Sequence, residues 1–453
     1  MSSATANRKL RANPLISRIA RVLTNSHVLG WADQAIVSAT SMLVLVMLGR
    51  WAGPHELGIY AIGFSIIALL LGTQDSLITK PYSVQLHEPS GSSAEHAFSV
   101  FMLAVMLSVV AAFVTAIAAL LASAFDIFHG MIQTALVLAA AIPFILMREF
   151  SRRYAFAHLA VAHALVVDLC VAVPTLIFIV ALGVSGQLSA SNAFAVMGIT
   201  CGVASISWFY LMREQFKLNR SQLYPALQRS WKMGKWFFSG QLAIQIQGYV
   251  APWMTLFIVG TIATGIYTAC TTIVAFANPL LFGYFNVLLP RFVLTLRQKG
   301  IAALRRQACL ATLLLAAIMG AFSLIVFAFG GVFMQLLFQG DYYSGYGELL
   351  TVLALASLAG SVGVPASLAL AAAGHARRVA GITALTAALH VVLIAVLLPG
   401  WGLLGAAYGM LVAEVIGGAG RWIAFLLLAA RNAPQESALA LGQPQTSSGS
   451  PKC

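Results

Sequence analysis

Apolar runs of about 20 residues, separated by short polar breaks, recur along almost the whole of this 453-residue chain. A helix of about 20 apolar residues is long enough to cross the hydrocarbon core of a bilayer. Only 9% of the residues are charged, whereas a soluble domain carries about 25%. We therefore predict an all-α integral membrane protein with about 12 transmembrane helices. The predicted spans are residues 31–49, 57–79, 97–122, 130–149, 156–184, 190–212, 236–259, 264–289, 307–331, 346–372, 378–398 and 403–430.

The placement of the basic residues gives an independent view of topology. Of the 26 Lys and Arg residues, all except Arg50 and Arg421 fall on one side of the membrane when the chain follows these spans. Cytoplasmic loops carry the excess of Lys and Arg, so both termini are predicted to be cytoplasmic. The net charge of +13 follows from this topology and from contact with anionic lipid headgroups, and it requires no nucleic-acid partner.

A sequence repeat divides the chain into two similar halves. Gly53–Ala61 reads Gly-Pro-His-Glu-Leu-Gly-Ile-Tyr-Ala and leads to Lys80-Pro81, while Gly260–Thr268 reads Gly-Thr-Ile-Ala-Thr-Gly-Ile-Tyr-Thr and leads to Pro290-Arg291. Both stretches begin on the same side of the predicted membrane. The repeat therefore predicts two six-helix bundles related by an axis along the membrane normal, an architecture typical of transporters.

Polar segments mark the limits of these bundles. The longest polar interval between spans, residues 213–235, is predicted to be a cytoplasmic linker between the bundles at 31–212 and 236–430. Residues 1–30 are predicted to be a basic cytoplasmic segment with a helix at 13–23 lying in the membrane interface. The Gln-, Ser- and Pro-rich segment 431–453 is predicted to be a disordered cytoplasmic tail.

Several stretches resemble the signatures of polysaccharide flippases, the Wzx-like members of the superfamily that also contains multidrug and toxin extruders and lipid II flippases. The similar stretches are Leu48–Tyr60, Val259–Ala269, Leu288–Arg291, Phe333–Tyr342 and Leu398–Gly409. They follow the family's order and together cover most of the chain. One departure is in the seventh span, where the family often has an acidic residue and this chain has glutamines, within Gln241–Val250.

The resemblance implies a function, a location and partners. It implies a bacterial inner-membrane transporter that flips an undecaprenyl-diphosphate-linked oligosaccharide to the periplasmic leaflet, for capsule, exopolysaccharide or O-antigen biosynthesis. Its partners would be this lipid-linked oligosaccharide, the membrane lipids and a polysaccharide polymerase or export machinery. The alternative is a cation-coupled multidrug extruder of the same superfamily. No loop is long enough for an extramembrane catalytic domain, so the protein is predicted not to be an enzyme.

A diphosphate substrate requires cations, and basic residues in or beside the spans are therefore candidate binding residues. Arg421 is either a cavity cation or the partner of Glu414 on the same helix face. Lys80 and Arg291 lie at matching positions of the repeat, where they either capture the diphosphate or are ordinary inner-loop charges. Arg50 either assists release or caps a helix C-terminus.

Other polar residues in the spans are candidates for sugar binding and ion coupling. Gln241 and Gln245 lie one turn apart, a spacing that suits either sugar hydroxyls or interhelical hydrogen bonds. Asp168 and Glu414 are candidates for coupling to a proton or sodium ion, and the alternative for Asp168 is pairing with an Arg or hydroxyl of a neighbouring helix. No residues have the spacing of metal ligands, and no cofactor is predicted.

Overall fold

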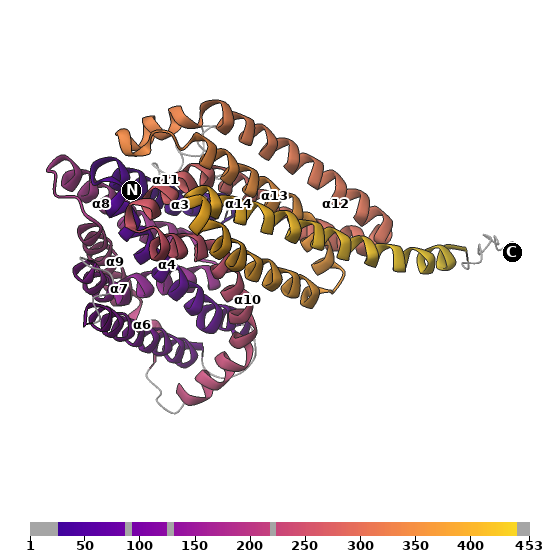
Figure 1. The fold of residues 1–453 in the computed structure, drawn as a ribbon. Coiled ribbons are helices and arrows are strands. Elements are labelled where there is room, and N and C mark those ends of the chain that lie inside the picture. The colour runs from indigo at the N-terminus through magenta and orange to yellow at the C-terminus, as the bar shows by residue number, and fades with distance from the viewer. Residues whose placement is uncertain (1–25, 87–92, 125–130, 218–222, 442–453) are drawn as a thin grey trace, which may run out of the picture. The chain divides into compact units, whose positions relative to one another are not determined.

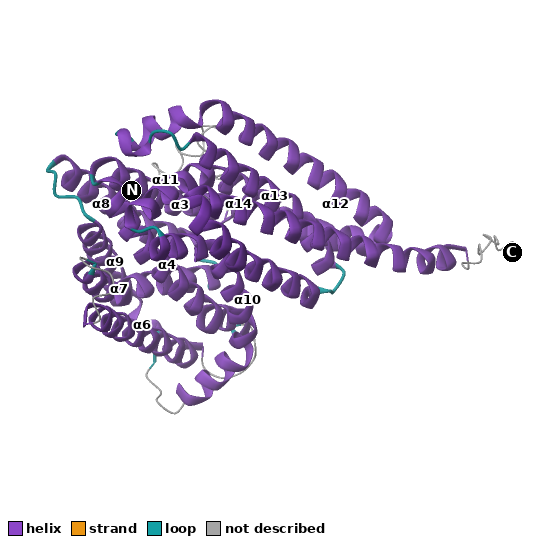
Figure 2. Cartoon of the chain, in the orientation of Figure 1, coloured by secondary structure: helices purple, strands orange, loops and turns teal. Residues whose placement is uncertain are grey.

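The computed structural model describes residues 26–86, 93–124, 131–217 and 223–441, and within these ranges every regular element is a helix (Figure 2). The predicted all-α membrane fold with two repeated bundles is confirmed. The predicted interfacial helix at 13–23 lies outside the described residues. The chain forms two compact units: unit 1 comprises Met1–Thr272 and Met334–Ser344, and unit 2 comprises Ile273–Phe333 and Gly345–Cys453.

Unit 1 contains the helices of the first repeat and the first two helices of the second. Helix α7 packs against α6 and α9, and α3 packs against α8 (Figure 1). The elements of unit 1 are α3 (Ser26–Trp51), α4 (Gly53–Gln74), η1 (Asp75–Thr79), α5 (Lys80–Gln85), α6 (Ser93–Ala124), α7 (Ile132–Ala157), α8 (Val161–Val184), α9 (Ala190–Met212), η2 (Arg213–Gln215), α10 (Leu223–Ile258), most of α11 (Thr261–Val274) and η5 (Asp341–Tyr343).

Unit 2 is built from the remaining long helices. These are η4 (Ala275–Ala277), most of α12 (Asn278–Phe338), α13 (Gly347–Ala372) and α14 (Ala376–Leu441). Helix α13 packs along α14, and the core at one end of the unit contains Phe292, Leu304, Leu370 and Phe425. Two of the long helices bend at a glycine with a positive φ: Gly300 in α12 and Gly402 in α14.

The number of helices agrees with the prediction. Among the described residues, nine helices are long and apolar enough to cross a membrane. The bends at Gly300 and Gly402 divide two of these, and the more polar α10 is a further helix. Together they give the predicted number of about 12 helices.

Several helices extend beyond their predicted spans. Helix α10 begins at Leu223 rather than at residue 236, within the predicted linker, and α12 ends at Phe338 rather than at residue 331. The fourth span was predicted to end at residue 149, but α7 continues to Ala157, and α8 then begins at Val161 after a turn in which Leu159 has φ 58°. The second span was predicted to end at residue 79, but α4, η1 and α5 form a continuous helix to Gln85. Its π-helical turn accommodates Pro81, which has no amide hydrogen to donate.

The two copies of the sequence repeat lie against each other in unit 1. Each begins a helix after a glycine with a positive φ, 87° at Gly53 and 113° at Gly260. A side chain at Gly58 would overlap the carbonyl oxygen of Thr261, and one at Gly265 would overlap the carbonyl oxygen of Pro54. The second glycine of each repeat therefore allows the backbones of α4 and α11 to touch. This reciprocal contact explains why both copies carry the same Gly-x-Tyr pattern.

A third family-like stretch packs beside the first. The Tyr343 hydroxyl donates a hydrogen bond to the Gly49 carbonyl (3.0 Å), and the Phe338 ring lies over Gly49. Arg50 donates to the Leu336 carbonyl at 3.4 Å. The segment Met334–Ser344 is therefore fixed on the C-terminal end of α3 within unit 1. These contacts show that the family-like stretches pack helices together, and Tyr60 of the first stretch also lines the cavity described below.

Candidate functional site

A cavity of about 510 Å³, lined by both apolar and polar residues, opens within unit 1. Its volume is in the range of small-molecule binding sites. All of its walls come from α3, α4, η1, α7, α8, α9 and α10. The polar and charged residues that line it are Gln34, Thr40, Ser41, Asp75, Arg148, Glu149, Arg152, Arg153, Asp168, Thr175, Gln241 and Gln245, and its aromatic residues are Tyr60, Phe64 and Tyr249.

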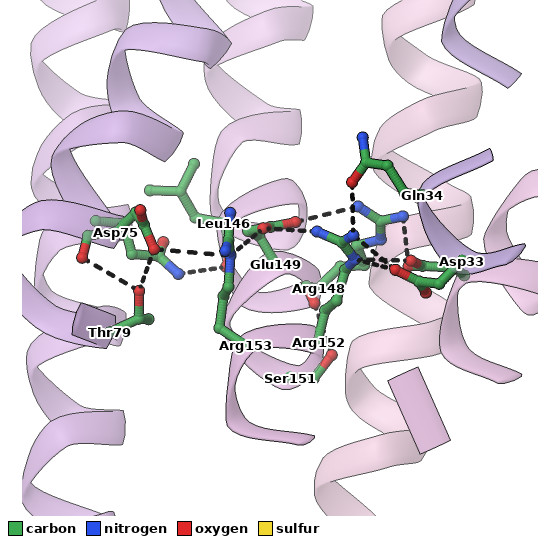
Figure 3. Close-up of polar contacts among 12 residues, drawn as sticks. Asp33, Gln34, Asp75, Thr79, Leu146, Arg148, Glu149, Ser151, Arg152 and Arg153 are labelled. Carbon is green, nitrogen blue, oxygen red and sulfur yellow. Dashed lines mark hydrogen bonds and ion pairs between the residues drawn. The ribbon is translucent and has the colours of Figure 1, made fainter. Parts of the chain in front are cut away.

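The buried Arg152 of α7 joins three helices at one wall of this cavity (Figure 3). Its Nη2 donates to Asp33 Oδ2 of α3 at 2.6 Å, and its Nε donates to Asp168 Oδ2 of α8 at 2.8 Å. Both carboxylates are completely buried. An unpaired buried carboxylate is unfavourable in such surroundings, and Arg152 supplies the compensating charge for both of them.

Two more arginines of α7 extend the network in opposite directions from Glu149 (Figure 3). Arg148 Nη2 lies 2.5 Å from Asp168 Oδ1, and Arg148 Nη1 donates to Glu149 Oε2 at 3.3 Å. Arg153 Nε donates to Glu149 Oε1 at 2.8 Å and lies 3.7 Å from Asp75 Oδ1. Glu149 therefore links the buried arginines to the edge of the cavity.

The network ends at two half-exposed cations. Lys80 Nζ pairs with Asp75 Oδ2 at 2.9 Å, and the Thr79 hydroxyl donates to Asp75 Oδ1 at the same distance. The side chains of Lys80 and Arg153 are 43% and 42% exposed, respectively. These are the cations of the network with room to contact a further group. The π-helical turn η1 places Asp75 between them.

Amide side chains from α10 also line the cavity. Gln245 Nε2 donates to the Ala68 carbonyl at 2.5 Å, which leaves its Oε1 oxygen available to accept. Gln241 and Gln245 both lie against Gly72 of α4, where the absence of a side chain makes room for them. Trp253 Nε1 donates to the Ser65 hydroxyl at 2.8 Å and holds α10 against α4.

The structure places the predicted site residues in both units. Lys80, Gln241, Gln245 and Asp168 belong to the cavity or its network in unit 1. Asp168 pairs with Arg148 and Arg152, as in the pairing alternative. Gln241 and Gln245 line the cavity, and Gln245 also makes an interhelical hydrogen bond to α4.

Arg50 lies outside this cavity. It is exposed at the end of α3, and it contacts the Leu336 carbonyl in the last turn of α12.

The remaining predicted residues lie in unit 2. Arg421 and Glu414 are neighbours on α14, with 3.8 Å between Arg421 Nη1 and Glu414 Oε2, so the pairing alternative describes their geometry. His390 Nε2 lies 3.7 Å from Glu414 Oε1. Gly360 and Gly363 of α13 leave room for the two charged side chains. Arg291, predicted as the counterpart of Lys80, is exposed on α12.

The sequence analysis did not single out Arg148, Glu149, Arg152 and Arg153. The three arginines were counted as cytoplasmic charges at the end of the fourth span, whereas the structure places all four residues on α7, at the wall of the cavity. A signal was present: Arg148 and Arg152 are four residues apart and share a helix face, and the spans contained buried acids that needed partners. The described residues contain no group of His, Cys, Asp and Glu that could hold a metal ion.

Comparison with known proteins relates this chain to others through structure alone. No protein-family model matches the chain, and no curated protein does. An inward-facing multidrug resistance MATE family transporter of the MOP superfamily shares its fold with a TM-score of 0.72 at 13% identity, over 88% of this chain and 95% of that one. An outward-facing MATE family transporter gives a TM-score of 0.59 at 12% identity, over 89% and 94%.

A further structure comes from Pyrococcus furiosus. It is a MOP superfamily transporter whose binding pocket of reversed polarity suggests a different function. It matches with a TM-score of 0.61 at 14% identity, over 90% of this chain and 98% of that one. This chain therefore has the fold of MATE-like transporters of the MOP superfamily.

Proposed function

We propose that this protein is an inner-membrane transporter that flips an undecaprenyl-diphosphate-linked oligosaccharide by alternating access. Two findings support transport: the fold is shared with MATE transporters described in inward- and outward-facing conformations, and the chain consists of two repeated bundles. The family-like motifs support a flippase of the Wzx type. In this function the protein would deliver its product to a polysaccharide polymerase or export machinery.

The cavity of unit 1 is the observation that carries this proposal. It offers half-exposed cations for a diphosphate and amides for sugar hydroxyls. Arg153 and Lys80 are the best placed cations, because their side chains are half exposed while Arg148 and Arg152 are held by buried carboxylates. An arginine binds phosphate oxygens in a bidentate manner and a lysine acts as a point charge.

A multidrug extruder is the competing candidate, and the names of the structural neighbours favour it. The electrostatics of the cavity favour the flippase. Asp75, Glu149 and Asp168, the carboxylates that line the cavity, are all paired with arginine or lysine. A cationic drug would have to break one of these pairs to find a partner charge.

The fate of lipid-linked glycan in cells distinguishes the two candidates. We expect cells lacking the gene to lose a surface polysaccharide and to accumulate its undecaprenyl-diphosphate oligosaccharide on the cytoplasmic leaflet. The leaflet is identified by whether an added glycosidase reaches the glycan in spheroplasts. Unchanged surface glycan together with greater sensitivity to cationic dyes would instead support the extruder.

Replacing both edge cations should impair transport without unfolding the protein. We expect the double variant Lys80→Ala, Arg153→Ala to restore surface glycan in deletion cells about tenfold less well than the unmodified protein, because the diphosphate loses its cations. The measurement is surface glycan per folded protein in the membrane. Lys232→Ala, an exposed change on α10, is the matched control. Full activity of the double variant would show that Lys80 and Arg153 do not bind the substrate.

A further inference from the structure

We propose that the cavity of unit 1 selects an uncharged glycan, so that the oligosaccharide carried contains neutral hexoses or amido sugars and no uronic or other acidic sugar. This inference rests on the proposed function and names the chemical class of the sugar.

The charges that line the cavity are balanced. Its wall contains three arginines and three carboxylates. The two further charged groups that contact this wall also cancel, because Asp33 pairs with Arg152 at 2.6 Å and the half-exposed Lys80 pairs with Asp75 at 2.9 Å. Every arginine of the wall therefore has a carboxylate partner. An acidic sugar that enters the cavity would therefore meet no arginine that lacks a partner.

The remaining polar groups of the lining are neutral. Gln34, Gln241 and Gln245 contribute amides, and Thr40, Ser41 and Tyr249 contribute hydroxyls. Amides and hydroxyls both donate and accept hydrogen bonds, as sugar hydroxyls do. The aromatic residues Tyr60 and Phe64 also line the cavity. Such a lining matches an uncharged, hydroxyl-rich ligand.

An acidic sugar would be disfavoured by this arrangement in two ways. Its carboxylate would leave water without gaining an unpaired cation, and it would lie close to the carboxylates that already hold the arginines. To bind, the sugar carboxylate would have to pair with an arginine that now pairs with Glu149 or Asp168. The carboxylate of that residue would then lose its compensating charge. The diphosphate avoids this penalty, because the half-exposed Lys80 and Arg153 at the edge remain partly hydrated.

Flipping of two matched substrates tests the inference. The purified protein is placed in proteoliposomes with an undecaprenyl-diphosphate trisaccharide that ends either in glucose or in glucuronic acid, and glycan exposure to an added glycosidase is followed with time. We expect the neutral substrate to cross at least about tenfold faster. Equal or faster transport of the acidic substrate would overturn the inference and leave the proposed function intact. Failure of both substrates to cross would overturn the proposed function and the inference with it.

Adding a cation to the cavity gives a second test. The Gln241→Lys variant places an unpaired positive charge in the lining, and we expect the neutral-to-acidic rate ratio to fall severalfold. Gln228→Lys, an exposed change on the same helix, is the control and should leave the ratio unchanged. If the folded Gln241→Lys protein kept the same neutral-to-acidic rate ratio, the charge of the cavity lining would not affect which sugar is transported. That result would overturn the inference.

Discussion

Replacing Arg152 by methionine is expected to lower the free energy of unfolding by about 3–5 kcal/mol, because the change removes the cation that compensates the fully buried Asp33 and Asp168. Methionine keeps much of the apolar length of the arginine side chain, so the loss reflects charge rather than packing. Thermal unfolding in detergent, followed together with the yield of monodisperse protein, measures the effect.

Two further variants identify the cause of this loss. Arg306→Met removes an exposed arginine from α12 and should have an effect within about 0.5 kcal/mol. Adding Asp33→Asn to Arg152→Met restores the charge balance and should recover part of the lost stability. A single Arg152→Met variant as stable as the unmodified protein would contradict the view that this network holds α3, α7 and α8 together.

A methyl group at Gly265 is expected to destabilise the protein by about 1–3 kcal/mol. It would overlap the backbone carbonyl of Pro54, and backbone cannot move aside as a flexible side chain can. The same result is expected for Gly58→Ala, whose new methyl would overlap the Thr261 carbonyl. Unfolding in detergent measures both variants.

Gly248→Ala is the matched control for these glycine variants. It lies in α10, and a side chain there would meet no atom within 4 Å. Because alanine favours a helix more than glycine does, this change should be neutral or stabilising by up to about 1 kcal/mol. If Gly265→Ala and Gly248→Ala behaved alike, the reciprocal contact of the two repeats would not be a close packing point.

Much of the fold could be predicted from the sequence because its causes are local. Span length and apolar content determine which segments can cross a bilayer, and the repeat at Gly53–Ala61 and Gly260–Thr268 predicts two similar bundles. The same stretches were harder to interpret as packing motifs. Which glycine touches which carbonyl depends on how α4 and α11 cross, and the spacing of residues along one helix does not determine that crossing.

The candidate site was predicted only in part, for a related reason. Asp168 and Gln245 were recognisable because a polar group in an apolar span requires a partner or a function. Arg148 and Arg152 were counted as topology signals, since several basic residues together are typical of a cytoplasmic loop. Asp33, a partner of Arg152, is more than a hundred residues away in the chain, and Asp168, which pairs with both arginines, lies on another helix. Only the folded bundle shows that these charges cancel.

Transport by the purified protein tests the central claim most directly. Proteoliposomes are loaded in parallel with an undecaprenyl-diphosphate oligosaccharide of neutral sugars and with a cationic dye, and movement of each across the bilayer is measured. Our account predicts that the lipid-linked glycan crosses and that the Lys80→Ala, Arg153→Ala variant slows it, while the dye does not cross. Transport of the dye without movement of the lipid-linked glycan would contradict the account and identify a multidrug extruder.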